Sequence, residues 1–270
     1  MKVVLFCGGM GMRLRGYSDQ IPKPLVEVGP RPILWHLMKY YAHFGHNEFI
    51  ICLGHGGQHI KRFFLDYNEC QMNDFVYADG GRTIELFGSD IKDWRITFVD
   101  TGLNANVGER LRLVQEHIGD DEMFLANYAD GLTDLDLNDY IESFRARGKI
   151  ACFLTVPAPH TFHVVQASTD GRVKSIEHIG QTPVRVNAGF FVFRRAIYDY
   201  LGEDEELILE PFDRLIAQDQ LIAVPHDGFW RQMDTFKDKA SLDELVANGL
   251  PPWQVWNESR LPPVDVGSSV

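Results

Sequence analysis

An apolar run that leads directly into a glycine cluster opens the chain, and it constrains the fold more than any other stretch. Residues 3–7 read Val-Val-Leu-Phe-Cys, and glycines stand at positions 8, 9 and 11 before Arg13. A run without polar alternation is typical of a strand buried on both faces of a parallel sheet. Glycines let the backbone turn sharply and approach a ligand closely. The stretch therefore predicts a strand that ends in a tight turn.

The turn matches neither of two common phosphate-binding patterns. No Gly-Lys-Ser/Thr follows it, as a Walker loop requires, and Arg13 replaces the third glycine of the dinucleotide-binding fingerprint. The glycine spacing alone favours a turn without a ligand about as much as a phosphate site. Arg13 and Lys23 favour the phosphate site, because two cations beside a glycine turn suit a polyphosphate.

Predicted strands alternate with predicted helices over much of the chain. Further strands are expected at residues 49–53, 123–128 and 150–156, and helices at 32–44, 58–65, 108–118 and 137–147. This alternation predicts an α/β fold with a Rossmann-like, doubly wound, mostly parallel mixed sheet. In such a sheet ligands bind beyond the carboxyl ends of the strands. The glycine turn, residues 54–57 and Asp130 each follow a predicted strand, so we expect them at one edge.

Two regions depart from this alternation. Residues 70–100 are expected to form a β insertion or antiparallel edge, with strands at 83–87 and 95–99. A small mixed sheet with sugar-binding residues is expected from residues 163–167, 173–177 and 189–193. A helix at 211–218, a short strand at 221–224 and a helix at 235–248 complete the chain. We expect one domain over residues 1–250 and a loose extension over 251–270.

Composition bounds the kind of protein. Among 270 residues 45% are hydrophobic, enough for a sizeable core, and the net charge of −12 argues against a nucleic-acid or membrane surface. An anionic ligand therefore needs cations, backbone amides or a metal close by. With neither a signal-peptide pattern nor a long apolar stretch, we expect a cytoplasmic protein. The four cysteines form no Cys-x-x-Cys pair and are expected to be free thiols.

Asp130 and Asp234 are candidate metal ligands. Asp130 follows an apolar strand, where it could equally cap the next turn, and Asp234 precedes the last helix, where it could be the N-cap. Together, two such carboxylates would bind Mg²⁺, with water and phosphate oxygens completing the octahedron. Residues 134–136 read Asp-Leu-Asp, like a glycosyltransferase metal motif, but helix capping explains them better. The ten histidines show no zinc-binding spacing.

Residues 8–14, Gly-Gly-Met-Gly-Met-Arg-Leu, with Pro-Lys-Pro at 22–24, resemble a known signature. It is the G-G-x-G-T-R-L and P-K-P pattern of the sugar-1-phosphate nucleotidyltransferases. The similarity runs from residue 1 to about residue 256 and is greatest to the glucose-1-phosphate cytidylyltransferase branch. The resemblance implies transfer of a nucleotidyl group, most readily CMP from CTP, to glucose 1-phosphate or a related sugar. It also implies pyrophosphate release, Mg²⁺ as cofactor and a homo-oligomer.

The resemblance assigns roles residue by residue. Arg13 would hold the departing pyrophosphate, Lys23 would stabilise charge near the α-phosphate, and Asp130 would act with them in catalysis. Asp130 and Asp234 would hold the metal. The nucleotide would contact Phe6, Gly8, Gly9, Gly11, Met12, Arg13, Lys23, His55 and Arg110. The sugar phosphate would contact Asp130, Glu177, His178, Asn187 and Gly189.

The residues expected to bind the acceptor, the sugar 1-phosphate, depart from the family pattern. His178 stands where the family has a lysine, and an imidazole with a pKa of about 6.5 is only partly charged at neutral pH. Residues 107–111 and 161–163 also differ from their family motifs, and Met12 replaces a threonine. Arg172, Lys174 or Arg185 could substitute for the lost lysine. Two further interpretations stay open: a transferase with another acceptor or base, and a nucleotide-sugar-binding regulator without turnover.

Overall fold

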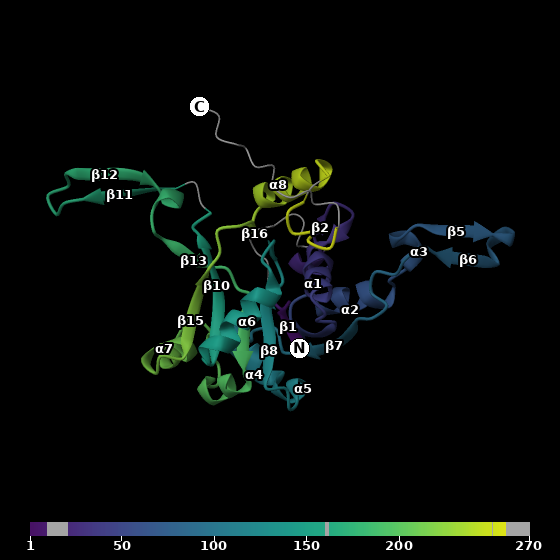
Figure 1. Cartoon of the computed structure of the whole chain (residues 1–270), viewed down its shortest axis with the longest axis horizontal. Coiled ribbons are helices and arrows are strands. Elements are labelled where there is room, and N and C mark those ends of the chain that lie inside the picture. Colours follow the sequence, from purple (N-terminus) through teal and green to yellow (C-terminus); the bar gives the residue numbers. More distant parts are fainter. Residues whose placement is uncertain (10–20, 160–161, 250, 258–270) are drawn as a thin grey trace.

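The computed structural model describes residues 1–9, 21–159, 162–249 and 251–257. Its centre is an eight-stranded sheet in the order β13-β10-β14-β8-β1-β4-β7, with β15 beside β10 (Figure 1). These strands are β1 (Lys2–Phe6), β4 (Glu48–Leu53), β7 (Arg95–Asp100), β8 (Met123–Tyr128), β10 (Ala151–Pro157), β13 (Arg185–Asn187), β14 (Phe191–Arg194) and β15 (Leu221–Pro225).

Strand directions give the sheet its class. β1 pairs in parallel with β4 and β8, β4 with β7, and β10 with β15. Only β13 and β14 run antiparallel to their neighbours in this sheet. The predicted mostly parallel mixed sheet is therefore confirmed. The chain leaves β1 for β4 and β7 on one side and returns to β8 on the other, so the β1–β8 boundary is a topological switch point, where open α/β sheets bind ligands.

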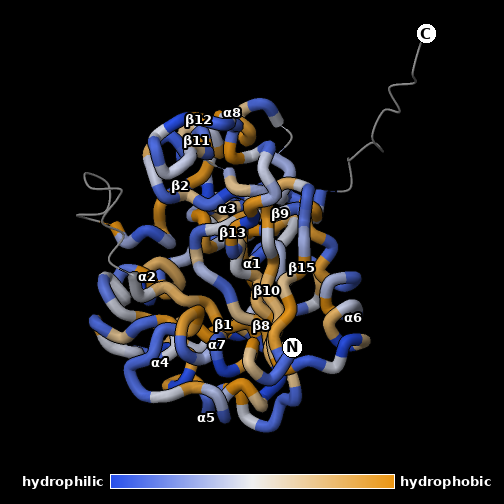
Figure 2. Tube along the Cα trace, turned by 90° about the vertical axis from the view of Figure 1, so that its left-hand side faces the viewer, coloured by the Kyte–Doolittle hydropathy of each residue, from blue (hydrophilic) through white to orange (hydrophobic). Residues whose placement is uncertain are grey.

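Both faces of the sheet are covered, which explains the apolar run at the start of the chain. Val3 and Leu5 belong to one buried cluster, while Val4 and Phe6 belong to the other. The first cluster packs under α1 (Ile33–His43), α6 (Leu137–Arg147) and α8 (Phe236–Ala247). The second packs under α4 (Val107–Leu113), α5 (Gln115–Ile118) and α7 (Glu210–Ala217). Figure 2 shows the hydrophobic strands enclosed between the more polar helices.

Helices with clear terminal signals follow the prediction well. α6 begins where the Asp136 side chain accepts a hydrogen bond from the Asp139 N–H at 3.1 Å, and ends at Gly148, whose φ is +63°. The helix predicted over residues 108–118 instead consists of α4 and α5, because the backbone leaves the helical conformation at Val114. Asp136 thus caps a helix, as the sequence indicates.

Two predictions about sheet membership are wrong. The segment 95–99 does not form part of an antiparallel insertion, because β7 pairs in parallel with β4 as the last strand of the main sheet. The segment 189–193 does not join a small separate sheet, because β14 lies between β8 and β10. The physical reason is burial: Phe191 and Phe193 are completely buried in the second cluster.

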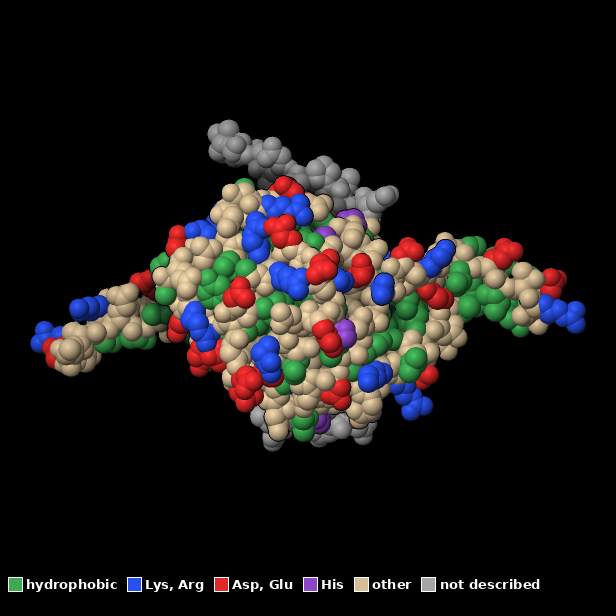
Figure 3. Space-filling view, turned by 90° about the horizontal axis from the view of Figure 1, so that it is seen from below, with side chains coloured by type: hydrophobic (Ala, Val, Ile, Leu, Met, Phe, Trp, Pro, Cys, Tyr) green, Lys and Arg blue, Asp and Glu red, His purple; other side chains and the backbone are tan. Residues whose placement is uncertain are grey.

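Two hairpins project from opposite ends of the main sheet (Figure 1). One is formed by β5 (Phe75–Ala78) and β6 (Thr83–Leu86), the other by β11 (His163–Ala167) and β12 (Val173–His178). Tyr77 and Ile84 are paired across the first hairpin and are 65% and 51% exposed. Figure 3 shows hydrophobic side chains gathered along this arm.

The remaining α-helices and strands are short. They are α2 (Gly57–Leu65), α3 (Glu69–Met72), β2 (Glu27–Val28), β3 (Arg31–Pro32), β9 (Gly131–Thr133) and β16 (Trp230–Gln232). All four cysteines are free, and Cys7, Cys52 and Cys152 are buried as expected for strand positions. No helix among the described residues combines the length and apolar character needed to cross a membrane.

Candidate active site

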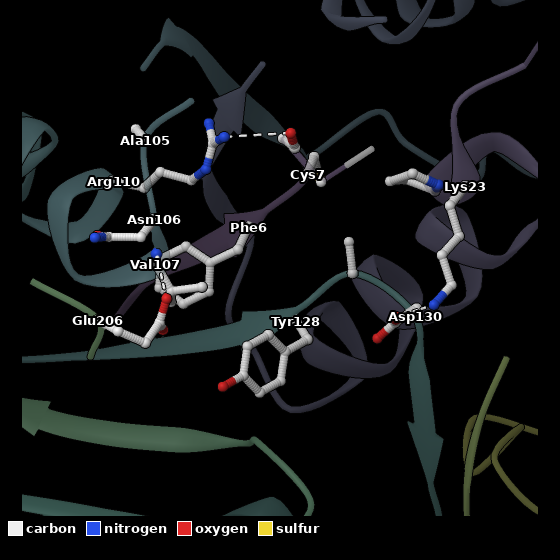
Figure 4. A pocket seen from close by; sticks show the side chains of 14 residues that line it. Phe6, Cys7, Lys23, Ala105, Asn106, Val107, Arg110, Tyr128, Asp130 and Glu206 are labelled. Atoms are coloured by element: carbon white, nitrogen blue, oxygen red, sulfur yellow. Dashed lines mark hydrogen bonds and ion pairs between the residues drawn. The ribbon is translucent and has the colours of Figure 1, made fainter. Parts of the chain in front are cut away.

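A cavity of about 270 Å³ opens at the carboxyl ends of β1 and β8, at the switch point of the sheet (Figure 4). Gly8 and Gly9 follow β1 on one wall, and Ala129 and Asp130 follow β8 on another. The other lining residues are Phe6, Cys7, Lys23, Pro24, Ala105, Asn106, Val107, Arg110, Tyr128 and Glu206. The glycine turn and Asp130 therefore meet at one edge of the sheet, as the sequence predicts, but residues 54–57 do not line the cavity.

Lys23 joins the two candidate metal ligands. Its Nζ lies 2.5 Å from Asp130 Oδ2 and 2.5 Å from Asp234 Oδ1. The two carboxylate oxygens are therefore separated by at most twice that distance. The side chains of Lys23, Asp130 and Asp234 are only 14%, 15% and 29% exposed, so these charges interact with little screening by water.

A short antiparallel pair, β9 with β16, brings Asp234 to Asp130. Gln232 is paired with Gly131, and the Met233 N–H donates to the Asp130 carbonyl oxygen at 2.9 Å. The Gln232 side-chain amide also donates to Asp130 Oδ2 at 3.2 Å. The ladder thus continues to Asp130 and Met233, and Met233 directly precedes Asp234, so the pairing brings the two aspartates together.

Asp234 is not the N-cap of the last helix. Thr235 fills that position in a capping box with Asp238, whose carboxylate also accepts from the Asp234 N–H at 3.1 Å. The capping alternative for Asp234 is therefore wrong, and its side chain is directed to Lys23 instead.

The charges of this cluster suit a cation. Burial by itself would lower the pKa of Lys23, but Asp130 and Asp234 raise the pKa above its ordinary value, so the ammonium stays protonated. Asp130 Oδ1 is buried and has no hydrogen-bond partner among the residues that the structure describes. A buried carboxylate oxygen without a partner, close to a second carboxylate, fits a divalent cation that prefers oxygen ligands. In the described part of the chain no three acidic, cysteine or histidine side chains gather as a metal cluster, so water and phosphate would supply the other ligands.

Arg110 connects the carboxyl ends of three neighbouring strands, β1, β4 and β7. Its buried guanidinium donates to the Leu53 carbonyl at 3.0 Å, to Thr101 Oγ1 at 2.6 Å and to the Gly8 carbonyl at 3.2 Å. A Cβ at position 8 would overlap the guanidinium, and one at position 54 would lie 2.8 Å from the Gly8 oxygen. Arg110 forms no ion pair with a described carboxylate, so its positive charge remains beside the glycine turn.

Glu206 and Tyr128 line the cavity although the sequence did not single them out. Glu206 comes from the loop before α7, and its Oε2 accepts from the Val107 N–H at 3.5 Å. Figure 4 places Glu206 and Val107 across the cavity from Lys23 and Asp130. Glu206 ends the acidic run at residues 203–206, and nothing in that run indicates which carboxylate enters the cavity.

The other predicted residues are dispersed. His55 is exposed and does not line the cavity. Glu177 and His178 lie at the end of β12 on a projecting hairpin, away from the cavity lining. Asn187 accepts from the Gly189 N–H at 2.9 Å, and Gly189 has a φ of +75°. Gly11, Met12 and Arg13 lie outside the described residues.

The proposed substitutes for the family lysine are engaged elsewhere or remote. Arg172 pairs with Asp170 in the turn between β11 and β12, at 3.1 Å. Arg185 pairs with Asp227 at 2.8 Å and also donates to two backbone carbonyls. Lys174 is exposed on the hairpin.

Comparisons with known proteins agree with this arrangement. The family described as Nucleotidyl transferase matches residues 2–242. Glucose-1-phosphate cytidylyltransferases of Salmonella typhi and Salmonella typhimurium are each 37% identical over 258 residues, covering 95% of this chain and all of theirs. The structure of HddC from Yersinia pseudotuberculosis in complex with GMP-PN superimposes with a TM-score of 0.63 at 19% identity. That match covers 91% of this chain and 99% of HddC, and it supports the fold.

Proposed function

The chain belongs to the nucleotidyl transferase family, and we propose that it transfers CMP from CTP to glucose 1-phosphate, giving CDP-glucose and pyrophosphate. The observation that carries the proposal is the Lys23–Asp130–Asp234 cluster at the switch point of the sheet. The full-length similarity to cytidylyltransferases favours CTP and glucose 1-phosphate as the substrates.

The reaction follows from the charges of the substrates. An oxygen of the sugar phosphate attacks the α-phosphorus of the nucleotide, the bond from that phosphorus to the bridging oxygen breaks, and pyrophosphate leaves. A phosphate monoester has a second pKa of about 6, so the attacking group is largely dianionic at neutral pH. No general base is then required. The site must align two polyanions and reduce their repulsion, and such reactions depend on positioning and electrostatics.

The residues divide this work. Asp130 and Asp234 would hold Mg²⁺, which when bound neutralises phosphate charge. Lys23 would stabilise charge at the α-phosphate, and Arg13 would hold the pyrophosphate. Gly8 and Gly9 would let the nucleotide approach the backbone, with Phe6 and the positively charged Arg110 beside them. Met12, Gly11 and His55 are further proposed contacts of the nucleotide.

The acceptor side is proposed to differ from that of the family. Asn187 and Gly189 lie near the cavity wall that Tyr128 forms, and they would contact the sugar. Glu177 and His178 lie at the end of β12 and outside the cavity lining, so their proposed contact with the sugar phosphate has no support from this cavity. The exchange of lysine for His178 therefore supports an altered acceptor or an altered grip on it.

A homo-oligomer is proposed on the basis of the first hairpin. Phe75 pairs with Leu86, and Tyr77 with Ile84, so one face of β5–β6 is apolar. An isolated two-stranded hairpin is only marginally stable in water. A second copy of the chain would cover this face.

Pyrophosphate release tests the function. The protein is incubated with each of four nucleoside triphosphates and a panel of sugar 1-phosphates, with and without Mg²⁺. CTP with glucose 1-phosphate should give the highest rate, and chelation should abolish it. Binding of substrates without pyrophosphate release would instead favour a regulator that has lost turnover.

A further inference from the structure

Glu206 places a second carboxylate in the cavity, across from Lys23 and Asp130 (Figure 4). Its carboxylate has one hydrogen bond to the described residues, the 3.5 Å contact from the Val107 N–H, and no described lysine or arginine forms an ion pair with it. A phosphate group would be repelled by this carboxylate. Glu206 must therefore face a part of the ligand that is not negatively charged.

The acidic residues nearby are used differently. Glu205 accepts from the Gly202 N–H at 2.8 Å and from Arg214 at 2.8 Å, so it stabilises its own loop. Glu109 accepts two hydrogen bonds from Arg112, at 2.7 and 2.8 Å. Both side chains have structural partners, whereas within the described part of the chain most of the acceptor capacity of Glu206 is unused.

The groups around Glu206 indicate which ligand chemistry fits. The Tyr128 side chain and the Glu206 carboxylate both line the cavity (Figure 4). A phenol hydroxyl and a carboxylate are therefore both available to a ligand in this cavity. A carboxylate only accepts hydrogen bonds, whereas a phenol hydroxyl both donates and accepts. Such a set matches neighbouring hydroxyl groups, each of which donates to one partner and accepts from another.

We infer that Glu206 is a specificity-determining residue that accepts hydrogen bonds from hydroxyl groups of a substrate sugar ring. The inference rests on the proposed function, in which both substrates carry such a ring. The shared chemistry is a pair of adjacent hydroxyls, supplied either by the ribose of the nucleotide or by the hexose of the acceptor. The metal end of the cavity, at Lys23 and Asp130, lies on the opposite side in Figure 4.

The test pairs a side-chain change with the removal of single hydroxyls. Glu206→Gln keeps the shape of the side chain and removes its charge, and Glu203→Gln on the same loop is the matched control, because Glu203 is exposed and outside the cavity lining. For each protein kcat/KM is measured with CTP, 2′-deoxy-CTP, 3′-deoxy-CTP and UTP. The acceptors are glucose 1-phosphate and its 2-, 3-, 4- and 6-deoxy analogues. Calorimetry measures binding of the same compounds.

Glu206→Gln should lower kcat/KM for the parent substrates about 10- to 100-fold, the usual effect of losing a hydrogen bond to a charged group. For the deoxy analogue that lacks the partner hydroxyl, the loss should be under about 3-fold. A ribose analogue would identify the nucleotide as the source, and a hexose analogue the acceptor. Glu203→Gln should leave every ratio unchanged.

Two results would overturn the inference. Equal losses for all substrates would show that Glu206 only maintains the loop. A change confined to the CTP-to-UTP ratio would show that the carboxylate binds the amino group of the base. Absence of turnover by the unmodified protein would refute the proposed function instead, and the calorimetric affinities would then still decide whether Glu206 binds a hydroxyl.

Discussion

Replacing Lys23 by methionine isolates the charge that separates Asp130 from Asp234. Methionine keeps the apolar stem and removes the ammonium that lies 2.5 Å from both carboxylates. Two carboxylate oxygens that both lie 2.5 Å from Lys23 Nζ are at most twice that distance apart, so they repel by at least roughly 3 kcal/mol at an effective dielectric constant of about 20. Loss of one partner of a buried ion pair typically costs about 3–5 kcal/mol. We therefore expect Lys23→Met to lose about 3–4 kcal/mol of stability without divalent ions, which lowers Tm by roughly 6–16 °C in a chain of this size.

A divalent cation should reverse most of this loss. In the unmodified protein Lys23 competes with the cation for the same carboxylates. The Lys23→Met variant should therefore bind Mg²⁺ and Mn²⁺ more tightly than the unmodified protein. A cation that binds the folded state stabilises it by RT ln(1 + [L]/Kd), about 2.7 kcal/mol at a hundredfold excess over Kd. Thermal unfolding with and without Mg²⁺ measures the rescue, and calorimetry with Mn²⁺ measures the affinity.

Lys237→Met is the matched control, because Lys237 is exposed at the start of α8, in the turn that follows Asp234. It should change neither the Tm nor the response to Mg²⁺. Two results would refute the role of charge in this cluster. One is a Lys23→Met variant that is as stable as the unmodified protein without metal. The other is an equal rise in Tm with Mg²⁺ for Lys23→Met and the unmodified protein.

Four further outcomes are expected. Asp234→Asn should reduce pyrophosphate release by at least about 100-fold, with a smaller effect at high Mn²⁺, as steady-state rates would reveal. Burial lowers the pKa of His36 to about 4 in the folded protein, whereas His36 in the unfolded chain binds its proton near pH 6.5. About 3 kcal/mol of stability should therefore be lost as pH falls from about 6.5 to 4. Urea unfolding at several pH values should show a flatter profile for His36→Gln. If the acceptor grip is altered as proposed, His178→Lys should change the acceptor KM, and an unchanged acceptor profile would contradict that idea. Tyr77→Lys should shift an oligomer toward smaller species in light scattering, whereas Lys61→Ala should not.

The buried elements of the fold could be predicted because their sequence signals are local. An apolar run without polar alternation identified β1, and the cap at Asp136 with Gly148 fixed both ends of α6. Strand partners are not local information. β14 carries the same apolar pattern as a strand of a small sheet, and only its position against β8 shows that Phe191 and Phe193 fill the main core.

The candidate site could be predicted in part for the same reason. Lys23 and the two aspartates stand in recognisable motifs. Their proximity depends on the β9–β16 pairing, and strands of three residues are too short to give a clear sequence signal. Glu206 lies in an acidic run whose members look alike in sequence, and only the turn before α7 decides which one enters the cavity. His178 occupies the position of a motif lysine, but it lies on the β11–β12 hairpin, and the motif does not predict where that hairpin is placed.

The β9–β16 pairing has a consequence for how this chain can change over evolution. The separation of the two carboxylates depends on three paired positions and one further backbone hydrogen bond, from Met233 to Asp130. The long connection between these strands contains the β11–β12 hairpin and helices α6 and α7, and it does not set the separation of the two carboxylates. Insertions there can reshape the acceptor surface while the metal ligands keep their geometry, whereas a shift of one residue between β16 and α8 would move Asp234 out of reach.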